Sequence, residues 1–284
     1  MDIFEGLTAR QIDIIRFTRS YREVEKGEVV FQEGEPARSL FTIVSGCINI
    51  VRQGLDGPAC VAALGPGEVF GEMGLLSKAG RTATAEAAES SLLFEIPNDA
   101  VLSMNAACGP EATIKLLSNL VLILSDRLGK QNASKVPGPK SWLADSVAVE
   151  AQDALATVAK ALPKKFLSKQ VAKKCLIPGE YLCRKNDPAD GFYFIHDGTL
   201  QVRDEKAGTS VPSTLDVLDG PAVTGQGAFL KRSPRNASLM AITDVSYTHF
   251  TSAEFQKMVE KRPQEALDVL MATAQYLVYW LARG

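Results

Sequence analysis

An internal repeat constrains the fold of this chain more than any single motif does, because it predicts two copies of one domain. In the first part of each copy, matching pairs recur at a separation of 152 residues: Gly27-Glu28 with Gly179-Glu180, Pro36-Ala37 with Pro188-Ala189, and Ser45-Gly46 with Asp197-Gly198. In the second part the separation is 154 residues: Gly71-Glu72 with Gly225-Gln226, Arg81 with Arg235, and Ala83-Thr84 with Ala237-Ser238. Two additional loop residues are therefore expected in the second copy, in the polar stretch from Asp204 to Ser213.

Each copy shows the same order of secondary-structure patterns. A helical pattern opens it, Leu7 to Tyr21 in the first copy and about Ala161 to Ala172 in the second. Short strand-like segments separated by Gly and Pro follow, for example Glu28 to Phe31, Leu40 to Val44 and Leu92 to Ile96. Apolar helices close the copies, Ala112 to Leu128 and Gln264 to Ala282. The patterns predict a mainly β fold with flanking helices (α+β), built from two tandem, jelly-roll-like β-barrels.

The composition fits a folded chain of two domains. A length of 284 residues exceeds the usual size of one domain, and 46% hydrophobic with 23% charged residues excludes a largely disordered chain. The segment from Gln131 to Pro139 combines polar residues with two prolines and predicts a boundary. We expect domains at residues 1–130 and 149–284, with a linker at 131–148.

Charge and hydropathy exclude several classes of partner. The net charge of −2 and the isoelectric point near 5.9 give no long-range attraction to nucleic acid or anionic lipid, so neither is expected as a direct partner. The first residues lack the pattern of a signal peptide, and no apolar run approaches the ~18 residues of a spanning helix. Five cysteines without a pairing framework or CxxC spacing fit a reducing cytoplasm.

The segment from Phe70 to Leu75, followed by Arg81 to Thr84, has the residues of an anion-binding turn. Small residues at Gly71 and Gly74 let the backbone approach a ligand, and amides at the start of a helical turn point toward negative charge. The guanidinium of Arg81 offers paired donors to phosphate oxygens. The carboxylate of Glu72 accepts hydrogen bonds and therefore requires a hydroxyl or amine on the ligand. Together these groups indicate a ribose phosphate.

With these residues in place, the segment resembles the phosphate-binding cassette of the cyclic-nucleotide-binding domain family. That family includes catabolite activator-type regulators, protein kinase A regulatory subunits and nucleotide-gated channels. Its pattern is Gly-Glu-(aliphatic)-(small)-Leu, then Arg-(small or Thr)-Ala-(Thr or aromatic). The resemblance implies that Glu72 holds the ribose 2′-hydroxyl, that Arg81 holds the cyclic phosphate and that Thr82 lies near the base. The implied binding residues are Gly71, Glu72, Met73, Gly74, Leu75, Arg81, Thr82 and Ala83.

The second cassette is altered. It reads Gly225-Gln226-Gly227-Ala228-Phe229, then Arg235-Asn236-Ala237-Ser238, so the arginine remains while the carboxylate becomes an amide. An amide lacks the charge-assisted strength of a carboxylate. We expect weak or no binding of cyclic nucleotide at Gly225, Gln226, Ala228, Arg235 and Asn236. An alternative is that Arg232 and Arg235 together hold a cyclic dinucleotide.

The expected function is that of a non-enzymatic cyclic-nucleotide receptor. Binding of cAMP or cGMP changes its conformation and regulates an effector protein that the sequence does not identify. Alternatives are a transcription regulator, a kinase regulatory protein, and a scaffold with degenerate pockets. Thr82 is reminiscent of cGMP-preferring sites, although some cAMP-responsive relatives also carry a hydroxyl residue there. A homodimer through the helix Ala112 to Leu128 is expected.

No catalytic residue, metal site or cofactor is expected. G-x-S-x-G, Walker and HExxH patterns do not occur in the sequence. The only two histidines, His196 and His249, lie far apart in strand-like contexts and are predicted to be structural.

Overall fold

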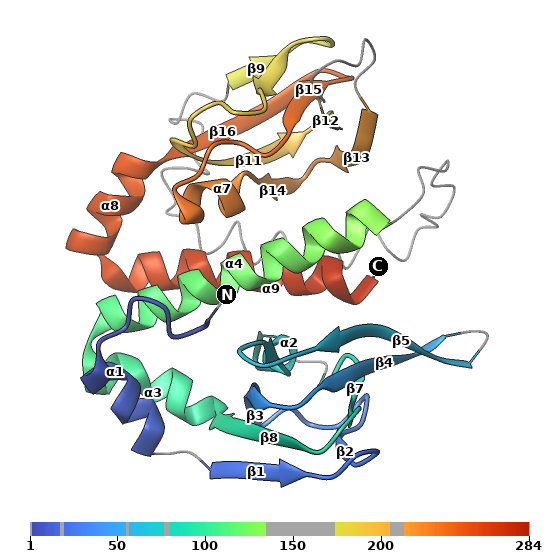
Figure 1. Ribbon diagram of the computed structural model, residues 1–284. Helices are drawn as coiled ribbons and strands as arrows, with labels where there is room; N and C mark the ends of the chain where they lie inside the picture. The colour runs from blue at the N-terminus through green and yellow to red at the C-terminus, as the bar shows by residue number, and fades with distance from the viewer. Residues whose placement is uncertain are drawn as a thin grey trace. The chain divides into compact units, whose positions relative to one another are not determined.

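The computed structural model describes residues 2–17, 20–54, 57–76, 80–134, 174–204 and 213–283 (Figure 1). The chain divides into two compact units, Met1–Ile123 and Leu124–Gly284. Three expectations lie wholly or partly outside the described residues: the linker from 135 onward, the helix Ala161 to Ala172, and the additional loop residues at 205–212. Residues 131–134, the start of the expected linker, form the last turn of helix α4.

The first unit consists of two four-stranded antiparallel sheets and flanking helices. One sheet has the strand order β1-β8-β3-β6, and the other has the order β2-β7-β4-β5. The strands are β1 (Ser20–Val24), β2 (Val29–Phe31), β3 (Ser39–Ser45), β4 (Ile48–Gly54), β5 (Gly57–Leu64), β6 (Val69–Phe70), β7 (Thr84–Ala87) and β8 (Ser91–Pro97). The helices are α1 (Ala9–Phe17), α2 (Glu72–Leu76), α3 (Asn98–Cys108) and α4 (Pro110–Ser134), of which α4 continues into the second unit.

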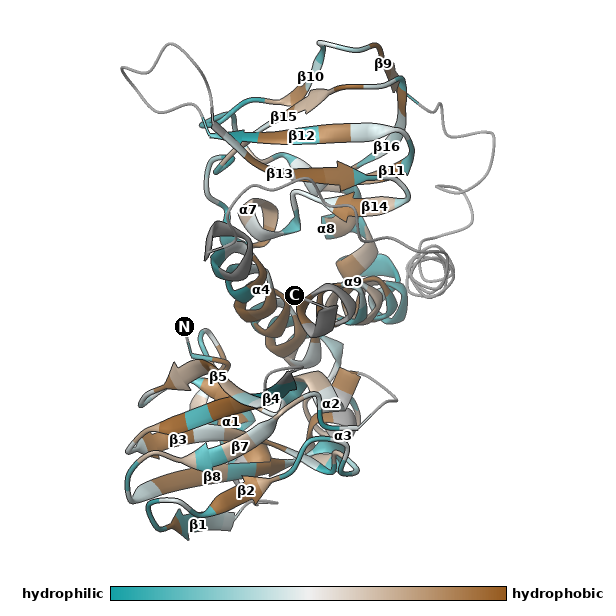
Figure 2. Cartoon of the chain, turned by 90° about the vertical axis from the view of Figure 1, so that its right-hand side faces the viewer, coloured by the Kyte–Doolittle hydropathy of each residue, from teal (hydrophilic) through white to brown (hydrophobic). Residues whose placement is uncertain are grey.

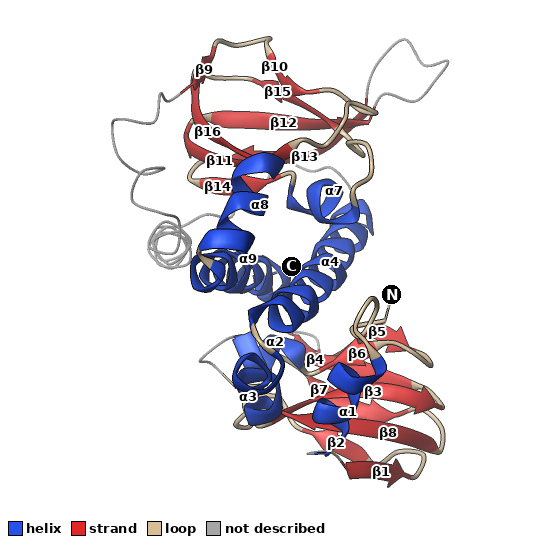
Figure 3. Ribbon diagram, turned by 90° about the vertical axis from the view of Figure 1, so that its left-hand side faces the viewer, coloured by secondary structure: helices blue, strands red, loops and turns tan. Residues whose placement is uncertain are grey.

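The second unit repeats this topology. Its sheets have the orders β9-β16-β11-β14 and β10-β15-β12-β13, so each strand takes the place of a counterpart in the first unit (Figure 3). The strands are β9 (Lys174–Leu176), β10 (Tyr181–Cys183), β11 (Gly191–Asp197), β12 (Thr199–Asp204), β13 (Ser213–Asp219), β14 (Ala222–Thr224), β15 (Ser238–Ala241) and β16 (Val245–Thr251). The helices are α7 (Gln226–Lys231), α8 (Ser252–Lys261) and α9 (Pro263–Arg283). The predicted fold class, two mainly β domains with flanking helices, is confirmed.

Side chains from both sheets form the core of the first unit. Each fully buried aromatic or aliphatic side chain contributes about 1.5–3 kcal/mol through burial. The cluster consists of Val24, Val30, Phe31, Phe41, Ile43, Ile48, Leu64, Phe70, Ala85, Ala87 and Leu93. Within it Phe31, Phe41 and Phe70 form an aromatic group, with ring centroids 5.1–5.9 Å apart. Figure 2 shows hydrophobic residues along the strands and along α4 and α9.

The first predicted helix is wrong at its C-terminal end. The pattern extended it to Tyr21, whereas α1 ends at Phe17 and Ser20–Val24 form β1. Strand β1 pairs with β8 from Ser20 opposite Glu95 to Val24 opposite Ser91. Pairing with an existing sheet edge and burial of Val24 override the weak local preference for helix.

The helix at the end of the first copy is preceded by a separate helix, α3. Gly109 has a φ of +79°, a conformation that favours glycine, and its N–H donates to Asn105 at the end of α3. Pro110 then occupies the first position of α4, where its missing N–H costs no helical hydrogen bond. No helix within the described ranges is long and apolar enough to cross a membrane.

Candidate functional site

The turn between β6 and α2 depends on Gly71. Its φ of +77° is accessible to glycine at little cost, and α2 begins at the next residue, Glu72. A Cβ atom at position 71 would stand 2.6 Å from Nη1 of Arg81 and 3.3 Å from the ring of Phe31. Backbone geometry and space therefore both require glycine here.

A second glycine brings α2 against the loop before β3. A Cβ atom at Gly74 would collide with the Cβ of Ala37. The same loop also binds the first residue of α3: the side-chain amide of Asn98 donates to the Ala37 carbonyl at 2.8 Å. The backbone N–H of Asn98 donates to the carbonyl of Arg38 at 2.9 Å. Ala37 thus lies between the cassette helix and the first helix that follows the sheets.

Arg81 is held in place by both its backbone and its side chain. Its N–H donates to the carbonyl of Glu35, and its carbonyl accepts from the N–H of Gly34, both at 2.9 Å. The side chain is buried, and its Nη1 donates to the Gly71 carbonyl at 3.0 Å. The guanidinium carbon lies 3.9 Å from the ring centroid of Phe31, within the range of a cation–π interaction.

The site contains a buried cation and a buried carboxylate. Arg81 is 6% exposed and Glu72 is 1% exposed. Burial lowers the pKa of Arg81, and the carboxylates of Glu35, Glu95 and Glu72 act in the opposite direction. Because arginine keeps its charge in proteins, the guanidinium remains a cation in a weakly hydrated setting. Its Nε is buried and has no hydrogen-bond partner within the described part of the chain.

The structure brings the predicted residues of the first cassette onto two facing segments. Residues 71–75 form the turn and α2, and residues 81–83 lie opposite, in contact through the Arg81–Gly71 hydrogen bond. The hydroxyl of Thr82 also donates to the sulfur of Met73 at 3.5 Å. Ala83 is buried, while the side chain of Leu75 is outside the described set.

Sequence reasoning missed the aromatic support of this site and its link to α3. In the sequence, Phe31 and Phe41 belong to strand-like segments and carry no sign of a binding role. They lie 40 residues or more before Arg81, which they contact in the structure. The repeat carried one available signal, since Tyr193 takes the position of Phe41 in the second copy and again lies beside the cassette arginine.

The second cassette reproduces the central contact of the first. Gly225 has a φ of +84° and directly precedes α7. Arg235 is 3% exposed, and its Nη1 donates to the Gly225 carbonyl at 2.9 Å. Its guanidinium carbon lies 5.0 Å from the ring centroid of Tyr193. The arginine that the two copies share thus makes the same hydrogen bond in both domains.

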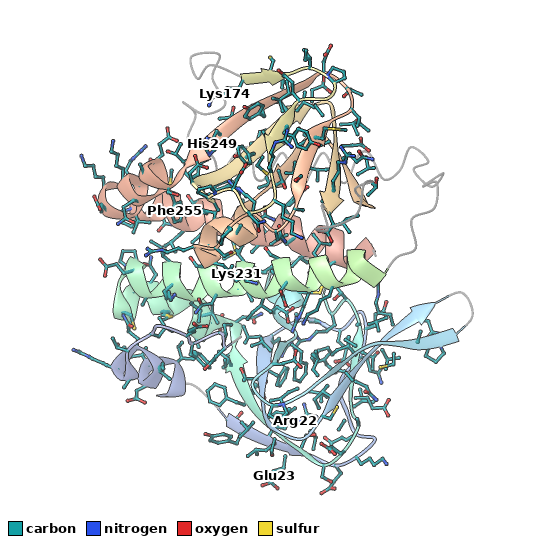
Figure 4. All side chains as sticks on the ribbon, turned by 45° about the horizontal axis from the view of Figure 1, so that its top comes forward. Arg22, Glu23, Lys174, Lys231, His249 and Phe255 are labelled. Atoms are coloured by element: carbon teal, nitrogen blue, oxygen red, sulfur yellow. The ribbon has the colours of Figure 1, made fainter. Side chains whose placement is uncertain are left out.

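The surroundings of Arg235 differ from those of Arg81. Its Nη2 donates to the Gly191 carbonyl at 2.8 Å and lies 3.6 Å from Oδ1 of Asp190. The same Asp190 oxygen is 3.3 Å from Nε2 of His249, an ion-pair distance without the alignment of a hydrogen bond. His249 lies on β16 (Figure 4) and stacks on Tyr193 with centroids 4.7 Å apart. Burial lowers the pKa of His249, and Asp190 acts in the opposite direction.

The remaining predicted residues of the second cassette lie on α7 and the segment that follows it. Gln226 is half-buried at the start of α7, and its Oε1 has no hydrogen-bond partner among the described residues. Ala228 is half-buried, and Asn236 is exposed. Arg232 is exposed at the C-terminal end of α7, whereas Arg235 is buried. Among the described residues, no group of three His, Cys, Asp or Glu side chains is arranged to hold a metal ion.

Known proteins are similar to parts of this chain. The Cyclic AMP receptor protein of Thermus thermophilus is 32% identical over 103 residues, which are 36% of this chain and 48% of that protein. The cGMP-dependent protein kinase egl-4 of Caenorhabditis elegans is 24% identical over 216 residues, which are 76% of this chain and 23% of the kinase. The matched regions thus span less than half of either relative.

A solved structure also aligns with most of the chain. The regulatory domain of Toxoplasma gondii PKA, co-crystallised with cAMP, is 17% identical, with 94% of this chain and 90% of that chain covered and a TM-score of 0.35. The family model of the cyclic nucleotide-binding domain matches residues 21–107 and again residues 173–262. With more than half of its length matched, this chain belongs to the cyclic nucleotide-binding domain family and carries two such domains in tandem.

Proposed function

We propose that the first domain is a non-enzymatic receptor for a cyclic mononucleotide, cAMP or cGMP, and that binding regulates an effector protein. The observation that carries the proposal is that Arg81 and Glu72 are both buried at one glycine turn, where Arg81 donates to the carbonyl of Gly71, the residue before Glu72. In this assignment the guanidinium binds the cyclic phosphate, and the carboxylate accepts the ribose hydroxyl. Backbone amides at the start of α2 add donors to the phosphate.

The burial of Arg81 supports a role in binding an anion. A guanidinium removed from bulk water interacts more strongly with a phosphate than an exposed one does, because the local dielectric is lower. Its position on Phe31 and its bonds to the 34–35 loop fix its geometry before the ligand arrives. A fixed cation binds with little loss of side-chain entropy.

The contact between Gly74 and Ala37 supports a route from the ligand to the helices. A ligand that draws α2 toward its phosphate changes the packing of α2 on Ala37. Asn98, the first residue of α3, is hydrogen-bonded to Ala37 and Arg38. The ligand thereby favours one position of α3 and α4, to the extent that it binds the two states with different affinity.

Further parts of the proposal concern partners and location. The five cysteines are free, which supports a reducing cytoplasm. The names of the Thermus and nematode relatives refer to cAMP and to cGMP respectively, so they support the class of ligand and leave both nucleotides as candidates. We propose that the protein forms a homodimer through α4 and acts on an effector protein, and that it binds neither nucleic acid nor membrane directly.

Binding of fluorescent cAMP and cGMP to the whole chain tests the proposal. Arg81→Ala should abolish binding by the first domain, and Arg81→Lys, which keeps the charge but loses the planar fork, should weaken it. Arg10→Ala, at an exposed position of α1, is the matched control and should bind like the wild type. Equal binding by the folded Arg81→Ala and Arg10→Ala variants would refute the assignment.

A further inference from the structure

The two cassette arginines differ in what already contacts them. Arg81 donates to one carbonyl of its cassette, that of Gly71. Arg235 makes the equivalent bond to Gly225 and, in addition, uses its other terminal nitrogen to contact Gly191 and Asp190. Arg235 is therefore engaged on both of its terminal nitrogens by groups of its own domain.

The residues responsible are those in which the two copies diverge. At the separation of 152 residues, Asp190 replaces Arg38 and Gly191 replaces Ser39. The first replacement reverses the charge at this position of the repeat, from arginine in the first copy to aspartate in the second. In the second domain a carboxylate oxygen lies 3.6 Å from the guanidinium, at the nitrogen that does not bond to the cassette carbonyl.

The replacement of Ser39 by Gly191 accompanies a second difference, at the position of Glu95 in the first domain and His249 in the second. His249 pairs with Tyr193 across β11 and β16, as Glu95 pairs with Phe41 across β3 and β8. In the first domain the Ser39 hydroxyl donates to Glu95 at 2.7 Å. In the second, a Cβ atom at Gly191 would stand 2.9 Å from Nε2 of His249 and would collide with the Phe250 carbonyl. Glycine therefore leaves space for the imidazole, whose Nε2 lies 3.3 Å from Oδ1 of Asp190.

The amide of Gln226 is a further difference between the two cassettes. It stands where the first domain has the buried carboxylate of Glu72. Its Oε1 is buried without a hydrogen-bond partner in the described residues, and the side chain borders a pocket with the apolar rings of Phe192, Phe229 and Phe255. The charged acceptor for a ribose hydroxyl is absent at this position.

We propose that Asp190 acts as an internal counter-anion for Arg235 and, together with Gln226, makes the second domain exclude cyclic nucleotides. A phosphate that approaches Arg235 must displace a carboxylate of the same sign of charge. This inference rests on the proposed function of the first domain, and it names the residues that prevent the second domain from binding a nucleotide in the same way. In the second domain, Arg235 is therefore held by groups of its own domain and binds no nucleotide.

The test converts the second domain in full-length protein that carries Arg81→Ala, so that the first site is silent. Calorimetry with cAMP and with cGMP should detect no binding to Arg81→Ala alone. Adding Asp190→Ala and Gln226→Glu should produce one site per chain, with an affinity at least about 10-fold above the detection limit of the Arg81→Ala titration. Adding Arg235→Ala to this variant should abolish the new site.

Two variants serve as controls for the conversion. Asp190→Asn with Gln226→Glu keeps the size of the side chain and should also create a site, which guards against a folding defect of the alanine variant. Asp268→Ala with Gln226→Glu removes an exposed carboxylate of α9 and should not reach the affinity of the conversion. Folded conversion variants without a nucleotide site would overturn the inference, as would binding by the unconverted second domain that depends on Arg235. The binding of the wild-type first domain is measured separately, so its failure would be distinguishable from either result.

Discussion

Nη1 of Arg81 donates a 3.0 Å hydrogen bond to the carbonyl oxygen of Gly71, ten residues earlier in the chain. This bond joins the two segments of the cassette, and Arg235 makes the same bond to Gly225 at 2.9 Å. The contact is therefore part of the fold of both domains, and what distinguishes the domains is the set of groups around it.

Gly71→Ala should destabilise the first domain by about 1–3 kcal/mol, because alanine is strained at a φ of +77° and its Cβ would press on Arg81. Nucleotide affinity should fall with it. Urea denaturation measures the free energy of unfolding. Gly65→Ala is the matched control, since its Cβ would meet no atom within 4 Å and its φ is not positive. Equal free energies for the two variants would contradict the account.

Glu72→Gln should reproduce in the first domain the amide found at position 226. The loss of a charge-assisted hydrogen bond to the ribose predicts an affinity lower by about 10-fold to 100-fold. Titration of the folded variant with cAMP and cGMP measures the change. An unchanged affinity for both nucleotides would remove Glu72 from the ligand site.

Asn119→Ala should release the N-terminal turn from α4. The buried side-chain amide of Asn119 donates to the carbonyls of Ile3 and Glu5, each at 2.9 Å. Its loss should lower the free energy of unfolding by about 1–3 kcal/mol, because the buried carbonyl of Ile3 and the part-buried carbonyl of Glu5 lose their donor. Hydrogen exchange should also become faster at the amide of Leu7, which donates to Phe4 in this turn. Unchanged protection of Leu7 would show that the turn is held by other contacts.

The stability of the second domain should fall in acid through His249. Burial lowers the pKa of this imidazole below 6.5 in the folded state, so the unfolded chain binds more protons at pH values between the folded pKa and 6.5. The stabilisation is fully present above about pH 6.5 and is lost as the pH falls through the lower, folded value. His249→Phe should flatten this dependence in denaturation curves recorded between about pH 5 and 8. A variant with the same slope as the wild type would contradict it.

The sequence predicted those features that recur at a fixed separation. The repeat anticipated the identical sheet orders, and the cassette pattern anticipated that residues 71–75 and 81–83 would meet. These predictions succeeded because a glycine turn and a following arginine act over about ten residues of chain.

The features that the sequence did not predict depend on distant pairing. Asp190 and His249 lie 3.3 Å apart only because β11 and β16 are neighbours in the sheet. The end of α1 was misjudged because β8, more than 60 residues away, recruits Ser20–Val24 into the sheet. Asn119 contacts the N-terminal turn across 114 or more residues, a relationship that no local pattern carries.

The stoichiometry of cyclic nucleotide binding to the wild-type chain tests the central claim most directly. Calorimetric titration with cAMP and with cGMP should give one nucleotide per chain for at least one of them, because only the first domain combines an arginine with a carboxylate at the cassette turn. The Glu72→Gln change should reduce the affinity of that single site. A stoichiometry of two per chain, or no binding of either nucleotide to folded protein, would contradict the account.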